Sequence, residues 1–179
     1  PIDHPRHLAF VPAAPTRAAI LFDLVTSASS IHGAYWMEGA GGILCENEAM
    51  QWLVSLTGMP APAFGVFTSG GTAANLSALV AAREKWRKDP KNCNVKGLMI
   101  TSSGAHSSIK AMAKVIDVDV LLVETEDAMS GLALQKVING LDTSERARVF
   151  AIVATGGTTN AGIIDALSGV AEVCEREQL

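Results

Sequence analysis

Apolar residues along this chain follow two patterns that predict different elements. Stretches with apolar residues three and four positions apart are typical of amphipathic helices, and short unbroken apolar runs are typical of buried strands. In residues 149–154 every position is apolar, which favours a strand that is covered on both faces. Strands of this kind belong to mostly parallel sheets.

The N-terminal third of the chain carries only the helical pattern. Thr16 can cap a first helix, and a second helix is expected from Glu46 to Gly58, after a glycine loop at residues 39–42. Prolines interrupt the opening segment, which is expected to be irregular. We therefore predict an N-terminal helical arm over residues 1–60.

Beyond this arm the pattern changes to strand, glycine-containing loop and helix. The alternation predicts an α/β region over residues 61–179, a mostly parallel sheet with flanking helices. Strands are expected at residues 65–68, 98–101, 118–123 and 149–154, and helices after Thr72 and His106 and at about residues 132–141 and 167–177. The chain ends after a helix, where the alternation predicts another strand, so we expect this region to be incomplete.

Composition and charge argue against several classes of protein. The net charge is −4 and no run of Lys and Arg occurs, so there is no basic footprint for nucleic acid. We expect no membrane span and no signal peptide, because no apolar stretch is long enough. The three cysteines lie far apart, which supports neither a disulfide framework nor a metal site. A cytoplasmic protein is expected.

The first residues along the chain that could bind a ligand are Ser69-Gly70-Gly71-Thr72, after the first expected strand. Two glycines let a bound anion approach the backbone, where N–H groups at the start of the next helix can donate to it. The hydroxyl of Thr72 adds another donor. The same residues would also suit a plain turn, and they match neither a Walker A loop nor a GxGxxG fingerprint.

Two further candidates follow other expected strands. His106 begins a helix, and the loop Thr155–Asn160 contains glycines and hydroxyls, including Thr159. Each alone could be an ordinary surface histidine or a turn. Because the carboxyl ends of parallel strands meet at one edge of a sheet, we expect all three loops to form one site. Its ligand would be phosphorylated and planar, with the anion at Thr72 and the ring against His106.

These stretches resemble the group II pyridoxal-phosphate decarboxylases, the family of aromatic-amino-acid and glutamate decarboxylases. Several ordered motifs at family-like spacing carry the resemblance: His4-Pro-Arg, Phe10-Val-Pro-Ala-Ala-Pro15, Glu46-Asn-Glu48, Gly58-Met-Pro60, Gly65-Val-Phe-Thr-Ser-Gly-Gly-Thr-Ala-Ala-Asn75, Ala105-His-Ser-Ser-Ile109 and Ala154-Thr-Gly-Gly-Thr-Thr-Asn-Ala-Gly-Ile-Ile-Asp165. The resemblance implies part of the large domain of a fold-type I enzyme, with pyridoxal 5′-phosphate as cofactor.

The resemblance also implies roles for single residues. Gly71 and Thr72 would hold the cofactor phosphate, His106 would stack on the pyridine ring and be the catalytic residue of this chain, and Thr159 would lie beside the ring. Phe10, Pro12 and Ala13 match an N-terminal arm that borders the substrate pocket. A homodimer that acts on an amino acid is implied, and the hydrophobic residues Phe10 and Trp36 favour an aromatic or apolar substrate.

Two expected groups of the family do not occur in these 179 residues: the aspartate that pairs with the pyridinium nitrogen and the Schiff-base lysine of a His-Lys pair. The isolated chain is therefore expected to be inactive and to belong to a longer polypeptide. Lys110 is interpreted as a solvent-facing helix residue and Asp165 as a helix cap.

Two alternatives stay open at this point. One is a truncated, non-catalytic protein that binds a phosphate ligand or a partner chain. The other is a different reaction on the same scaffold, such as aldehyde synthesis or carbon–carbon cleavage.

Overall fold

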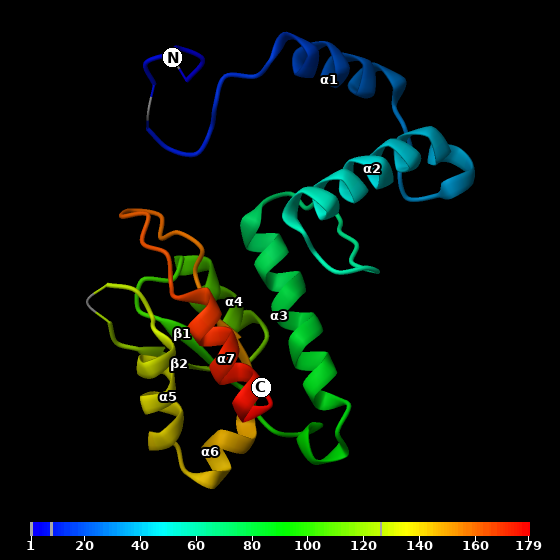
Figure 1. Cartoon of the computed structure of the whole chain (residues 1–179). Coiled ribbons are helices and arrows are strands. Elements are labelled where there is room, and N and C mark those ends of the chain that lie inside the picture. Colours follow the sequence, from blue (N-terminus) through cyan, green and yellow to red (C-terminus); the bar gives the residue numbers. More distant parts are fainter. Residues whose placement is uncertain (1, 8, 126) are drawn as a thin grey trace. The chain divides into compact units, whose positions relative to one another are not determined.

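Two units make up the chain, Pro1–Phe67 and Thr68–Leu179. The computed structural model describes residues 2–7, 9–125 and 127–179, and Figure 1 shows their secondary structure.

The N-terminal unit contains two helices, as expected. Helix α1 spans Arg17–Ser29, and its first turn is capped by Thr16, whose hydroxyl accepts a 3.1 Å hydrogen bond from the Ala19 backbone N–H. Helix α2 spans Trp36–Thr57 and ends at Gly58, which adopts the left-handed conformation typical of helix ends.

The expected glycine loop at residues 39–42 is wrong, because these residues belong to α2. Only Gly39 departs from helical geometry, and it produces a kink. A glycine costs a helix interior about 1 kcal/mol, which helix-favouring neighbours can offset. A β-carbon on Gly39 would lie 2.7 Å from the His32 carbonyl oxygen, so the preceding segment packs closely against the kink.

The C-terminal unit contains a three-stranded parallel sheet, which confirms the predicted α/β class. Its order is β2-β1-β3, with parallel pairing on both sides of the central strand. The strands are β1 (Leu98–Ser102), β2 (Asp119–Val123) and β3 (Val149–Val153); the helices are α3 (Gly71–Arg87), α4 (Ser107–Val115), α5 (Gly131–Gly140), α6 (Thr143–Arg148) and α7 (Leu167–Glu177), with a 3₁₀ turn η1 (Pro90–Asn92).

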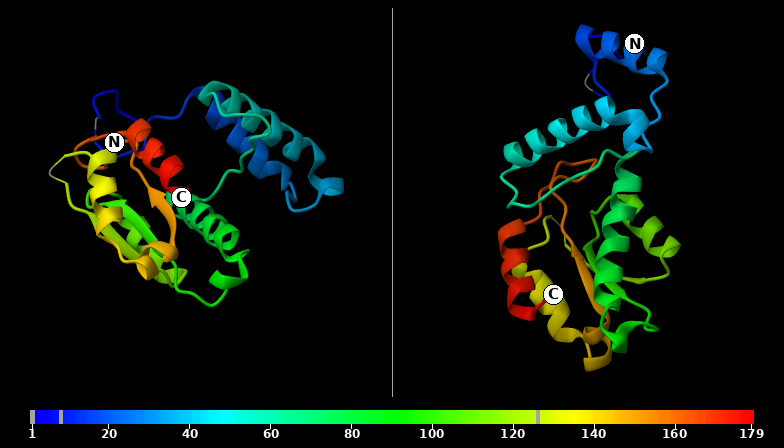
Figure 2. Two further views of the ribbon diagram at one scale, coloured as in Figure 1. Left: turned by 60° about the horizontal axis from the view of Figure 1, so that its bottom comes forward. Right: turned by 90° about the vertical axis from the view of Figure 1, so that its right-hand side faces the viewer.

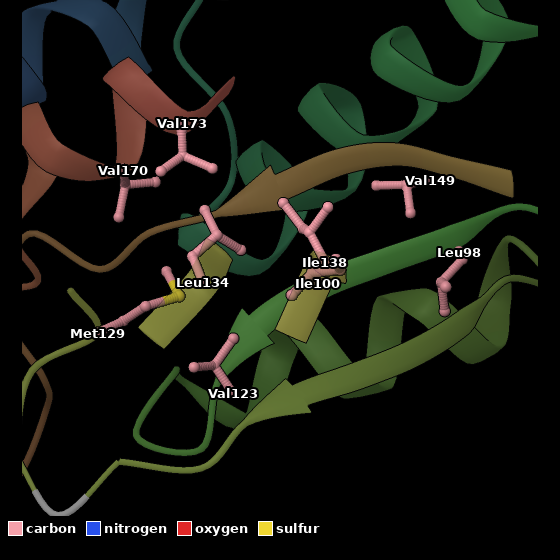
Figure 3. Packing of buried hydrophobic residues seen from close by; sticks show 9 residues of the cluster. All are labelled: Leu98, Ile100, Val123, Met129, Leu134, Ile138, Val149, Val170 and Val173. Atoms are coloured by element: carbon pink, nitrogen blue, oxygen red, sulfur yellow. The ribbon is translucent and has the colours of Figure 1, made fainter. Parts of the chain in front are cut away.

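Helices cover both faces of this sheet (Figures 1 and 2). On one face, Ile100 of the central strand packs with Leu134 of α5 and Val170 of α7, in the cluster that Figure 3 shows. On the other face, Met99 packs with residues of α3 and α4 such as Leu79 and Ile109. Neighbouring residues of β1 thus face opposite layers, and all five residues of the strand are buried. This explains the consecutive apolar residues Leu98, Met99 and Ile100 at its start.

Two elements differ from the sequence-based expectation. The strand expected at residues 65–68 is irregular, and the side chains of Val66 and Phe67 are exposed. No strand of the described chain pairs with this segment, and a strand needs a partner for its backbone N–H and C=O groups. Helix α6 was not predicted, although Asp142 and Glu145 form a capping box at its start.

Charged residues form ion pairs at the amino-terminal edge of the sheet. The Lys96 ammonium lies 2.9 Å from a carboxylate oxygen of Asp119, and Arg148 pairs with the same carboxylate. The hydrogen bond from Lys96 holds the pKa of Asp119 below its usual value, because it favours the ionised carboxylate. The amino-terminal edge of the sheet thus carries ion pairs. The loops at the carboxyl ends of the strands, at the opposite edge, are the candidates for a binding site.

None of the helices in the described residues combines the length and the apolar character that crossing a membrane requires. Within residues 2–7, 9–125 and 127–179, no three His, Cys, Asp or Glu side chains gather in a way that could hold a metal ion.

Candidate functional site

A cleft of about 620 Å³ lies at the carboxyl ends of the three parallel strands; we call it the strand-end cleft. The loops that follow β1, β2 and β3 all contribute to it. It is lined by Ser103, Gly104, Ala105, His106, Ser107, Lys110, Thr125, Asp127, Thr158, Thr159, Asn160, Ala161 and Ile163. His106 and Thr159 are 53 positions apart in the sequence, and both line this cleft.

A second cleft, of about 440 Å³, surrounds the turn before α3; we call it the α3-turn cleft. It is lined by Ser69, Gly70, Gly71, Thr72, Ala73, Leu76 and Met112. Gly70 has a φ of +153°, which side chains rarely tolerate, so the turn requires glycine there. No side chain of the described residues caps α3, and the backbone N–H groups of a first helical turn have no partner within the helix. The turn can therefore donate to an anion.

The expected single site is divided between these two clefts. Helix α4 supplies Lys110 to the strand-end cleft and Met112 to the α3-turn cleft. Residues two positions apart on a helix do not share a face, so the two clefts border different sides of α4. The two clefts are still linked near the starts of α3 and α4, because the Asn75 amide donates a 2.9 Å hydrogen bond to the Ser108 hydroxyl.

His106 is the N-cap residue of α4. Its ring nitrogen Nδ1 accepts a 3.2 Å hydrogen bond from the backbone N–H of Ser108 and lies 2.8 Å from the hydroxyl oxygen of the same residue. These contacts hold one edge of the ring against the helix start. The ring itself is exposed and lines the strand-end cleft, so its face is accessible to a planar ligand.

Lys110 follows one helical turn after His106. Its side chain is exposed, and it also lines the strand-end cleft. The cleft therefore contains a cation, and Asp127 on the loop after β2 adds an anion.

Asp165 has a role that sequence reasoning missed. Its expected function as a helix cap is wrong, because Ala166 is the N-cap residue of α7 and the Asp165 carboxylate bonds elsewhere. One carboxylate oxygen accepts a 2.7 Å hydrogen bond from the Met129 backbone N–H, and the other accepts a 2.7 Å bond from that of Thr155.

These two bonds connect two loops of the strand-end cleft. Met129 closes the loop that carries Thr125 and Asp127, and Thr155 opens the loop that carries Thr159. Asp165 as a whole is only 3% exposed, so the hydrogen bonds of its carboxylate are sheltered from water. No signal in the sequence indicates its burial, since the preceding Ile164 is itself exposed.

The predicted substrate arm lies in the N-terminal unit. Phe10 is 91% exposed, and its ring lies 6.4 Å from that of His7, measured between centroids. Pro12 and Ala13 are also exposed. The expectation that Phe10, Pro12 and Ala13 border the substrate pocket stays a prediction.

Comparison with known proteins gives consistent matches along the chain. A family profile described as "Pyridoxal-dependent decarboxylase conserved domain" matches residues 2–179. The aromatic-L-amino-acid decarboxylase of Bacillus atrophaeus is 33% identical over 184 aligned residues, which cover 99% of this chain and 37% of that protein. The L-2,4-diaminobutyrate decarboxylase of Rhizobium meliloti (strain 1021) is 29% identical, over 99% of this chain and 36% of that protein.

Solved structures agree on the fold. The crystal structure of mouse CSAD in apo form superposes with a TM-score of 0.84 at 24% identity, over 99% of this chain and 39% of that one. The 4-hydroxyphenylacetaldehyde synthase of Rhodiola rosea gives a TM-score of 0.82 at 22% identity, over 96% of this chain and 39% of that one. The chain thus spans somewhat more than a third of the length of these relatives.

Proposed function

The chain belongs to the pyridoxal-dependent decarboxylase family, and we propose that the protein to which it contributes is a carboxy-lyase that releases CO₂ from an L-amino acid. The observation that carries the proposal is the strand-end cleft, where loops after three parallel strands bring His106 and Thr159 together. Ligands of open α/β sheets bind at this edge.

The residues present fit pyridoxal 5′-phosphate. The strand-end cleft has the size of small-molecule sites, which measure roughly 300–1,000 Å³. We propose that the exposed ring of His106 stacks on the pyridine ring, with Thr159 beside it. Gly71 and Thr72 would donate to the phosphate from the free first turn of α3. When bound, the cofactor supplies the electron sink for the carbanion that loss of CO₂ leaves behind.

The residues of the cleft would orient the substrate and hold its charges. Lys110 offers a cation to a carboxylate, and Asp127 offers an anion to an amino group. We propose an aromatic amino acid as substrate. The similarity to the aromatic-L-amino-acid decarboxylase of Bacillus atrophaeus supports this choice.

We also propose a homodimer. Helix α1 has no buried residue, and apolar side chains such as Leu21 and Leu24 are each more than 60% exposed. An apolar surface of this extent is usually covered in the working protein.

The whole protein tests the reaction directly. Supplied with pyridoxal phosphate, it is expected to release CO₂ from an aromatic L-amino acid at least tenfold faster than from glutamate, and to form one equivalent of amine. Trapped CO₂ and chromatography of the products measure both. Formation of an aldehyde without amine would instead support an aldehyde synthase, and no CO₂ from any amino acid would contradict the proposal.

The role of His106 is tested by the binding of 4′-deoxypyridoxine phosphate, which lacks the aldehyde and so reports only non-covalent contacts. We expect His106→Phe to keep the affinity within about threefold, because a flat ring remains. His106→Ala is expected to weaken binding by up to about tenfold, the scale of one aromatic stacking contact. Lys114→Ala, on the same helix but outside both clefts, is the control. Equal loss in both His106 variants would mean that a ring nitrogen holds the cofactor.

A further inference from the structure

Asn75, Ser108 and His106 form a hydrogen-bonded chain between the two clefts. The Asn75 amide donates to the Ser108 hydroxyl at 2.9 Å, and that hydroxyl lies 2.8 Å from Nδ1 of His106. Ser108 is 5% exposed, and Asn75 is half-buried. Water therefore competes weakly for these bonds, and they can fix the state of the groups they join.

The directions of these bonds follow from the chemistry of the donors. A backbone N–H can only donate, so the bond from the Ser108 N–H requires Nδ1 of His106 to be an unprotonated acceptor. The Ser108 hydroxyl oxygen already accepts from the Asn75 amide. Its own proton is therefore free to be donated to Nδ1. Both donors impose the same state on the ring, with the single proton of the neutral imidazole on Nε2.

Helix capping alone does not explain this arrangement. Serine, threonine, aspartate and asparagine are the preferred N-cap residues, and histidine is not among them. The amide of Asn75 adds nothing to the cap itself, since it comes from another helix 33 positions away in the sequence. The chain of bonds instead fixes the position of the proton on the His106 ring, and this ring lines the strand-end cleft.

We propose that Asn75 and Ser108 are positioning residues that hold His106 as the Nε2–H tautomer, so that His106 presents a hydrogen-bond donor, and not a base, to the strand-end cleft. No partner of Nε2 lies among the described residues, so this N–H is available to an oxygen of a bound substrate, while the face of the ring stays available to the cofactor. The proposal deepens the proposed function, since it rests on His106 belonging to the ligand site. The state of the ring can nevertheless be measured without any ligand.

The hydrogen bond between Asn75 and Ser108 has a second consequence, which concerns both clefts. Asn75 lies one helical turn beyond Gly71 and Thr72, which line the α3-turn cleft. The orientation of the His106 ring is thus tied to the helix that would bind an anion. A ring fixed in this way needs no reorganisation when a planar ligand arrives, and preorganisation of this kind lowers the cost of binding.

Nitrogen-15 spectra of the chain with labelled histidine test the proposal. Pyrrole-like and pyridine-like ring nitrogens resonate far apart, and His106→Phe identifies the signals of His106 among the four histidines. We expect a pyridine-like Nδ1 and a pyrrole-like Nε2 at a pH where the ring is neutral. In Asn75→Asp the new carboxylate accepts a hydrogen bond from the Ser108 hydroxyl, so this hydroxyl no longer donates to Nδ1 of His106. The ratio of Nε2–H to Nδ1–H should then fall about fivefold, the effect of one net hydrogen bond.

Matched variants separate positioning from general destabilisation. Ser108→Ala should shift the ratio in the same direction, whereas Ser108→Thr keeps a hydroxyl and should restore it. Ser77→Ala removes an exposed hydroxyl that bonds only to the Ala73 carbonyl of the same helix, and it should change nothing. The fluorescence of Trp86, whose ring lies 6.1 Å from that of Phe150 between centroids, reports whether the C-terminal unit of each variant is folded, and Asn75→Ser replaces Asn75→Asp if that variant is not.

A wild-type ring with its proton on Nδ1 would overturn the proposal. So would a ratio that stays unchanged in both the Asn75 and the Ser108 variants. Because these spectra need no cofactor, failure of the chain to bind 4′-deoxypyridoxine phosphate would count against the proposed function alone.

Discussion

Replacing Asp165 with alanine is expected to lower the free energy of unfolding of the C-terminal unit by about 3 kcal/mol or more. The substitution removes two hydrogen bonds to an ionised group, each worth about 1.5–3 kcal/mol. It also leaves the backbone N–H groups of Met129 and Thr155 without these partners. A buried donor that loses its partner keeps the cost of its desolvation, so the loss is larger than that of a surface hydrogen bond.

Two backbone bonds reinforce the contacts of this carboxylate. The Asp165 N–H donates to the Thr155 carbonyl at 2.9 Å, and the Ala166 N–H donates to the Met129 carbonyl at the same distance. The segment before α7 is thus bonded on one side to the end of β3 and on the other to the loop after β2. Losing the carboxylate should loosen both loops, and with them the wall of the strand-end cleft that carries Thr159 and Asp127.

Urea titration followed by Trp86 fluorescence measures this effect. Trp86 lies in α3 with its ring 6.1 Å from that of Phe150, between centroids, and it therefore reports on the C-terminal unit. Replacing Trp36 and Trp52 with phenylalanine leaves it as the single tryptophan of the three. In this background, Asp165→Asn should retain one of the two bonds and fall between wild type and Asp165→Ala.

Asp127→Ala is the matched control, because it removes an exposed carboxylate from the same cleft. It should change the unfolding free energy by less than about 0.5 kcal/mol. A loss of under 1 kcal/mol in Asp165→Ala would show that the two loops hold together without the carboxylate.

The sequence predicted those features that depend on local pattern. The three strands of the sheet each contain a run of at least three consecutive apolar residues, and their observed bounds lie within a residue or two of the expected ones. The rule that ligands bind at the carboxyl edge of parallel strands also brought His106 and Thr159 to one place correctly. Neither inference needed knowledge of distant contacts.

The features that escaped prediction depend on partners far along the chain. The Asp165 carboxylate bonds to a backbone group 36 positions away, and Asn75 bonds to Ser108 across 33 positions. No periodicity records such contacts. The same reason explains the wrong strand at residues 65–68, whose pattern is apolar but which has no neighbouring strand in the described chain. The division of the site into two clefts depends on the side of α4 that each residue occupies, which spacing alone did not reveal.

The second large effect is expected where α5 and α7 meet. These helices lie side by side on one face of the sheet (Figures 1 and 2), and their closest approach is at Gly131 and Gly169. A β-carbon on Gly131 would overlap the Gly169 carbonyl oxygen and lie 2.8 Å from its carbonyl carbon. The obstructing atoms are backbone, so no side-chain rotation can relieve the overlap.

We therefore expect Gly131→Ala to lower the free energy of unfolding by about 1–3 kcal/mol, the usual cost of overpacking a well-packed interior. To relieve the overlap, α5 and α7 must move apart, and this displaces Leu134 and Val170 from the core that both helices share (Figure 3).

Gly169→Ala is the matched control. A β-carbon there would lie 3.5 Å from the Gly131 nitrogen, which is ordinary contact, and alanine favours a helix over glycine by up to about 1 kcal/mol. This variant should be as stable as wild type or more so. The single-tryptophan background measures both variants by urea titration, and equal stability of the two alanine variants would contradict the asymmetry of this helix contact.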